Sequence, residues 1–99
     1  MLIKKLKGLG PKSAQMLLSI GIRSREDLER IGPVRAYALL QQEQPATTSL
    51  NLLYAMVGAL ENRHWASITH EEKARLLMEL ESYKELNSVL KDSDPDAQL

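Results

Sequence analysis

The chain has 99 residues, 43% of them hydrophobic, with 13 basic and 13 acidic side chains and no cysteine. This length suits one small domain, and the absence of cysteine excludes disulfide bonds and thiolate metal sites and favours a reducing cytoplasm. No apolar run reaches the ~18 residues of a membrane span and the start lacks the apolar stretch of a signal peptide, so we expect a cytoplasmic protein without membrane contact.

Glycine and proline divide the first 45 residues into short helical segments. Pro11 suits the first turn of a helix over 11–19, where its missing N–H costs nothing. Gly21 is expected to end that helix with a positive φ. The residues expected on its inner face are Ala14, Leu17 and Leu18. The leucines ahead of the turn, at helical or near-helical spacing, are Leu2, Leu6 and Leu9.

Two more helices are predicted before a polar loop at 41–48. Ser24 with Asp27 three residues later resembles a capping box, with Asp in place of the usual Glu or Gln, and predicts a helix over 25–30. Pro33 begins another helix, which runs to about Gln42.

The second half of the chain predicts two amphipathic helices. Ser49 or Thr48 caps the first, and Thr69 with Glu72 forms a capping box that begins a long helix over about 70–91. The apolar stripe of the first helix is Leu50, Leu53, Tyr54, Val57 and Leu60. The apolar side of the long helix is Leu76, Leu77, Leu80, Tyr83, Leu86 and Leu90.

No segment has the pattern of a strand, so the predicted fold class is all-α. We expect a compact bundle of five to six helices over 1–91, ending in the longer helix, and a disordered acidic tail over 92–99.

An internal repeat with an offset of 22 residues relates residues 6–18 to residues 28–40. Its identical pairs are Leu6 and Leu28, Gly10 and Gly32, Pro11 and Pro33, Ala14 and Ala36, Leu17 and Leu39, and Leu18 and Leu40. The repeat predicts two tandem helix-hairpin-helix-like units, at about 2–20 and 24–42. The second copy has Arg30 and Val34 where the first has Gly8 and Lys12, so we expect the second to be structural.

The first hairpin resembles the helix-hairpin-helix motif of many DNA-repair and polymerase-associated proteins. Its two glycines allow a positive φ and a close approach to a partner, and the following helix offers unpaired N–H groups to a phosphate oxygen. Such contact is independent of base sequence. The predicted nucleic-acid-binding residues are Lys4, Lys5, Lys7, Gly8, Gly10, Lys12 and Ser13.

Charge is unevenly distributed along the chain. Residues 1–45 carry eight basic and four acidic side chains, whereas residues 46–99 carry five basic and nine acidic ones. This asymmetry is compatible with a phosphate-facing N-terminal end and also with an ordinary solvated surface. Degenerate hairpins also serve as packing or protein-binding units, so DNA contact and protein interaction both stay open.

Residues 49–60 followed by His64-Trp65 resemble the signature of the C-terminal domain of the TfoX/Sxy family of competence regulators. Residues 9–14, Gly21-Ile22 and residues 26–28 occur in the same order in that family, and the resemblance covers about 2–80. It implies a non-enzymatic regulator of natural DNA transformation that acts on transcription with the cyclic-AMP receptor protein. Family members usually carry an N-terminal α/β domain, so this chain is either the C-terminal half of such a protein or a stand-alone member.

The end of the long helix is the predicted partner surface. Leu76, Tyr83 and Leu90 are seven residues apart, which fits either a dimer seam or a face that covers the hairpins. The predicted partner-binding residues are Tyr83, Leu86 and Leu90. Candidate partners are duplex DNA, the cyclic-AMP receptor protein, an N-terminal TfoX domain and a second copy of the chain.

No catalytic residue, cofactor, small-molecule ligand or metal is predicted. His64 and His70 lack the further ligands that zinc requires. Trp65 is expected to fill the core and to donate its indole N–H to a backbone acceptor. Gly58 is expected to allow close approach of the 11–19 helix or of Trp65, because glycine inside a helix otherwise costs about 1 kcal/mol.

Overall fold

The computed structural model describes residues 1–92, and the side chains of residues 1–86. Its elements are η1 (Ile3–Lys5), α1 (Pro11–Ser19), α2 (Arg25–Ile31), α3 (Pro33–Glu43), α4 (Leu50–Glu61), η2 (Trp65–Ser67) and α5 (His70–Asp92). These elements are five α-helices and two 3-10 turns, and the described residues form no strand, which confirms the all-α fold. The predicted tail beyond Asp92 lies outside the described residues.

Local capping signals set the helix boundaries as predicted. The Ser24 hydroxyl accepts the Asp27 N–H at 3.1 Å. Thr69 and Glu72 cap each other: the Thr69 hydroxyl accepts the Glu72 N–H at 3.1 Å, and the Glu72 carboxylate accepts the Thr69 N–H at 3.2 Å. Ser49 occupies the N-cap of α4 without a side-chain capping bond, whereas the Thr48 hydroxyl donates to carbonyl groups at the end of α3.

Helix α4 is the central element of the core. Its buried residues are Leu52, Leu53, Tyr54, Met56, Val57, Gly58 and Ala59. Helices α2 and α3 and the turn η2 all pack against it. The guanidinium of Arg25 donates to the Leu60 carbonyl at 2.6 Å and so connects the start of α2 to the last turn of α4. Leu50 is exposed, contrary to the predicted stripe, because it is the first residue of α4 and precedes the buried turns.

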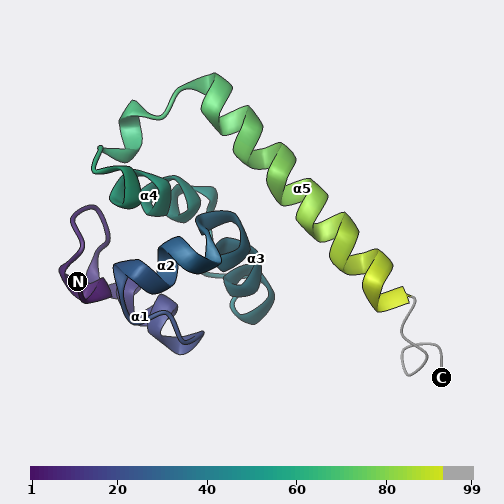
Figure 1. Cartoon of the computed structure of the whole chain (residues 1–99), viewed down its shortest axis with the longest axis horizontal. Helices are drawn as coiled ribbons and strands as arrows, with labels where there is room; N and C mark the ends of the chain where they lie inside the picture. Colours follow the sequence, from purple (N-terminus) through teal and green to yellow (C-terminus); the bar gives the residue numbers. More distant parts are fainter. Residues whose placement is uncertain (93–99) are drawn as a thin grey trace.

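Helix α5 packs against α3 through one narrow face only. Leu80 is buried, Leu76 and Tyr83 pack partly buried against the core, and the Lys73 ammonium lies 5.0 Å from the centre of the Tyr54 ring. Leu77 and Leu86, predicted on the same apolar side, are exposed. In Figure 1, α5 runs down one side of the bundle and its end projects beyond the other helices, which explains the exposure of Leu86.

The repeat is visible in the structure, but its two copies differ in detail. In both, a glycine is the N-cap, a proline begins the helix, and the glycine carbonyl accepts the N–H of an alanine at 3.0 Å (Gly10 to Ala14, Gly32 to Ala36). The buried leucines are not the matched ones: Leu17 and Leu40 are buried, whereas Leu18 is 45% exposed. The prediction for Leu18 is wrong because α1 has fewer neighbours than α3, which packs against α2, α4 and α5.

The segment before the first hairpin forms a single 3-10 turn instead of a longer helix. Its backbone pairs with the α1–α2 connection: the Ile3 N–H donates to the Arg23 carbonyl and the Arg25 N–H donates to the Met1 carbonyl, both at 2.9 Å. The early leucines, although at helical or near-helical spacing, thus lie in a segment whose backbone is tied to the α1–α2 connection. Only the second unit has an α-helix on each side of its turn, α2 and α3.

Candidate nucleic-acid interface

The first hairpin is a tight loop held against the core. Gly8 has a φ of 92°, whereas Gly10 has a φ of −76°, so the prediction that both glycines supply a positive φ is wrong for Gly10. Leu6 and Leu9 are buried on either side of Gly8. A Cβ on Gly8 would lie 4.0 Å from that of Ala59. The loop therefore lies directly over α4 with its backbone exposed at Gly8.

Helix α1 begins at this loop with its first N–H groups uncapped. Gly10 is the N-cap, no side chain makes a capping hydrogen bond, and no acidic residue occupies the first turn. The partial positive charge of a helix N-terminus is therefore not neutralised locally. Lys12, in the first turn, is exposed and Ser13 is half-buried.

The lysines around the loop are exposed and lack acidic partners. Within the described residues, no ion pair involves Lys4, Lys5, Lys7 or Lys12. In the second unit, by contrast, Arg25 lies 3.6 Å from Glu29 and Arg30 lies 3.2 Å from Asp27. Other cations, among them Arg23 and Arg35, also form no ion pair with a described residue, but four such groups lie within residues 4–12 at the first hairpin.

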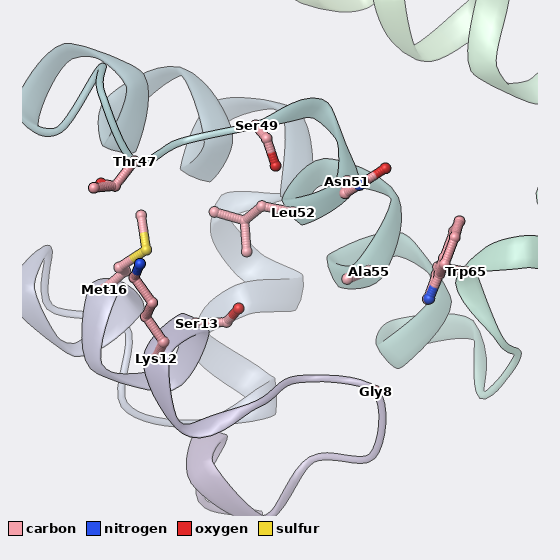
Figure 2. Close-up of a pocket in the computed structure, with 10 residues that line it drawn as sticks. All are labelled: Gly8, Lys12, Ser13, Met16, Thr47, Ser49, Asn51, Leu52, Ala55 and Trp65. Carbon is pink, nitrogen blue, oxygen red and sulfur yellow. The ribbon is translucent and has the colours of Figure 1, made fainter.

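A cavity of about 310 Å³ separates the hairpin from the start of α4 and from Trp65. Figure 2 shows Lys12 at one end and Trp65 at the other, with Ser13, Leu52 and Ala55 between them. Lys12 is the only charged residue in the lining. The cavity thus combines an ammonium group, hydroxyl groups and an aromatic wall.

A second cavity, of about 300 Å³, lies on the other side of Gly8. Lys7, Arg63 and His64 line it. The guanidinium of Arg63 is already paired, with Glu61 at 3.1 Å and Glu72 at 3.0 Å, and its hydrogen bond lowers the pKa of the Glu72 carboxyl. Lys7 is therefore the cationic side chain of this cavity that has no carboxylate partner among the described residues and can bind a ligand.

Trp65 is 43% exposed, which contradicts its predicted place in the core. Asn62 ends α4 in the left-handed conformation, with a φ of 59°, and the turn that follows carries Trp65 to the surface beside the hairpin. The His64 ring lies 5.5 Å from the indole, and its Nδ1 accepts the Ala66 N–H at 3.0 Å. The sequence did not predict that Trp65 lines a cavity beside the hairpin, although the resemblance that joined the hairpin to His64-Trp65 was a signal for it.

The predicted partner residues lie far from the hairpin. Tyr83 is half-buried, Leu86 is 59% exposed, and the side chain of Leu90 lies outside the described residues. In Figure 1 the N-terminal loop and the end of α5 are at opposite sides of the molecule. In the described part of the chain, no group of three or more potential ligands could hold a metal ion, and no helix is long and apolar enough to span a membrane.

Comparisons with known proteins agree with this architecture. A family model described as the TfoX C-terminal domain matches residues 2–80. A crystal structure of an uncharacterized protein from Listeria monocytogenes is similar in fold, with a TM-score of 0.72 and 21% sequence identity, over 85% of this chain and 94% of that one. No curated protein matches the sequence.

Proposed function

Because the chain belongs to the family of TfoX C-terminal domains, we propose that it is a non-catalytic regulatory domain of DNA transformation that contacts the phosphate backbone of duplex DNA. The contact surface is the first hairpin with the start of α1. Its cations are Lys4, Lys5, Lys7 and Lys12, and its backbone donors belong to the first turn of α1 after Gly10, including Ser13.

The observation that carries the proposal is the difference between the two units of the repeat. Four exposed lysines without acidic partners in the described residues surround the first hairpin, whereas in the second unit Arg25 and Arg30 are paired within α2 and Arg35 is the exposed cation without a partner among the described residues. The exposed backbone at Gly8 and the uncapped start of α1 add donors for phosphate oxygens. A hairpin of this size neutralises few phosphates, so the binding is weak, sequence-independent and salt-sensitive.

Titration of a labelled duplex at several low salt concentrations tests the proposal. The double variant Lys7→Gln/Lys12→Gln should weaken binding and reduce the slope of log K against log salt by about one unit for each phosphate that is no longer neutralised. The double variant Arg75→Gln/Lys84→Gln, on α5, removes the same charge and should bind as the unchanged chain does. Equal effects of the two variants, or no binding at all, would contradict the proposal.

A second candidate role is protein interaction through α5, for example with the cyclic-AMP receptor protein, an N-terminal TfoX domain or a second copy. It is supported by the exposure of Met78 (69%) and Leu86 and by the projection of the helix end (Figure 1). Light scattering of the chain and of Leu86→Glu tests self-association, and pull-down with each protein tests the others. A monomer that captures neither protein would remove this candidate.

A further inference from the structure

We propose that the cavity between the first hairpin and Trp65 binds one unpaired nucleotide of a DNA strand, with the base against the indole and the phosphate at Lys12. The inference rests on the proposed function, since it places the bound strand on the same hairpin. It adds a selectivity that phosphate contact alone does not give: a preference for unpaired over fully paired DNA.

The first argument is the state of Trp65, the only tryptophan in the chain. It is 43% exposed at the wall of a cavity, and it donates no hydrogen bond to any described residue. The adjacent His64 ring, tilted by 30°, supports one part of the indole. An exposed aromatic ring beside a cationic groove is the platform on which single-stranded nucleic acids stack their bases, whatever the base.

The second argument is the chemistry of the cavity. Its lining supplies the Lys12 ammonium and the hydroxyl groups of Ser13 and Ser49, and it contains no carboxylate. The cavity between α4 and α5 differs, because Glu61, Glu72 and Glu79 line it. Of these two cavities, the one that contains Lys12 therefore suits an anion that also carries hydrogen-bonding groups.

The third argument is the arrangement of these groups. Lys12 and Trp65 lie at opposite ends of the cavity, and the apolar side chains of Leu52 and Ala55 lie between them (Figure 2). A nucleotide has the same order of groups, with a phosphate at one end, a sugar in the middle and a flat base at the other. The volume of about 310 Å³ lies at the lower end of the range for small-molecule sites, roughly 300–1,000 Å³, and suits one such unit.

A paired base cannot occupy this cavity, because both of its faces are covered inside the duplex stack. An apolar side chain of a protein partner fits the lining less well, since it would cover the Lys12 ammonium and the hydroxyl groups without offering them acceptors. The occupant that satisfies both ends is therefore an unpaired nucleotide, at a strand end, a gap or a single-stranded stretch.

The lone tryptophan makes the test direct. The full chain is titrated at low salt with a labelled DNA strand and, separately, with the same strand annealed to its complement, while the fluorescence of Trp65 and the anisotropy of the label are recorded. We expect the single strand to bind more tightly than the duplex and to quench Trp65. Trp65→Ala should weaken single-strand binding about tenfold to a hundredfold and remove the preference, and Trp65→Phe should retain part of it.

Controls separate this inference from the proposed function. Leu77→Ala removes an exposed apolar side chain from α5 and should leave both affinities unchanged, and circular dichroism checks that each variant is folded. Duplex binding without a single-strand preference, or without any effect of Trp65→Ala, would overturn the nucleotide site and leave the hairpin contact standing. Absence of binding to either form would overturn both, and capture of a protein that depends on Trp65 alone would assign the cavity to a protein partner.

Discussion

Gly58 and Arg63 approach each other so closely that a Cβ built on Gly58 would lie 2.5 Å from the Arg63 carbonyl oxygen. The Arg63 N–H donates to the Gly58 carbonyl at 2.8 Å, which folds the chain back over the end of α4. The backbone nitrogen of Trp65 would lie 3.3 Å from the same Cβ. Glycine inside α4 thus allows the turn that places Trp65 beside the first hairpin.

Gly58→Ala should therefore destabilise the protein, although alanine favours helices over glycine by about 1 kcal/mol. The new methyl group meets backbone atoms, which cannot move aside as a side chain can. We expect a loss of about 1–3 kcal/mol in the free energy of unfolding, measured by urea denaturation. Ala74→Gly on the exposed face of α5 is the control and should cost about 1 kcal/mol by propensity alone. A gain in stability for Gly58→Ala would contradict the close approach.

The helix boundaries could be predicted because their signals are local. The capping box of Thr69 and Glu72 and the proline at the start of α1 act through residues one turn away, and both helices begin where predicted. The predictions failed where contact with a segment distant in the sequence determines the local structure. The N-terminal segment pairs with the α1–α2 connection and forms only the short turn η1, and no pattern within residues 2–9 reveals that pairing.

The part of the candidate site that lies within one short segment was also predictable, because its signals are local. The composition of the first hairpin singled out its lysines and Gly8; in the structure Lys7 and Lys12 line cavities on Gly8, whereas Lys4 and Lys5 lie on η1. The position of Trp65 depends on the left-handed conformation of Asn62 and on the close contact at Gly58. Both residues lie about 50 residues after the hairpin in the sequence. Sequence reasoning placed an apolar side chain in the core by default, and only the fold reveals that this tryptophan faces a cavity.

Alanine substitutions at the matched leucines should lower the free energy of unfolding to different extents in the two copies of the repeat. Leu17→Ala should cost about 2–5 kcal/mol of unfolding free energy, because Leu17 is fully buried, whereas Leu18→Ala should change it by less than about 0.5 kcal/mol. In the second copy the order is reversed, so that Leu40→Ala costs more than Leu39→Ala. Thermal and urea denaturation measure all four variants. A larger loss for Leu18 than for Leu17 would show that the copies share one register.

Glu72 should make stability depend on pH in the acid range. Its pKa is lowered below 4.5, chiefly by the hydrogen bond from Arg63 and also by the Thr69 N–H. A carboxyl whose folded pKa is depressed contributes stability above its unfolded pKa and loses it as the pH falls through the folded pKa. We therefore expect the melting temperature to fall as the solution is acidified below a pH of about 4.5, and Glu72→Gln to reduce that dependence.

Glu71→Gln is the matched control for the acid-range prediction. Glu71 is exposed in the same first turn of α5 and favours the helix dipole as Glu72 does, but it forms no ion pair with any described residue. Its substitution should lower stability at neutral pH only slightly and leave the acid dependence in place. An equal loss of pH dependence in both variants would mean that the helix dipole, and not the pair with Arg63, is responsible.

Gly8 and Gly10 should respond differently to alanine, although both belong to the hairpin. Gly8 has a φ of 92°, which an L side chain adopts only with strain, so Gly8→Ala should cost about 1–2 kcal/mol of unfolding free energy even though space for a methyl group exists. Gly10 has a φ of −76° and nothing within 4 Å of an added Cβ, so Gly10→Ala should cost less, through the weaker N-cap alone. Urea denaturation of the two variants gives the comparison. Equal losses would mean that the hairpin relies on both glycines for a positive φ, as the spacing of the motif alone suggested.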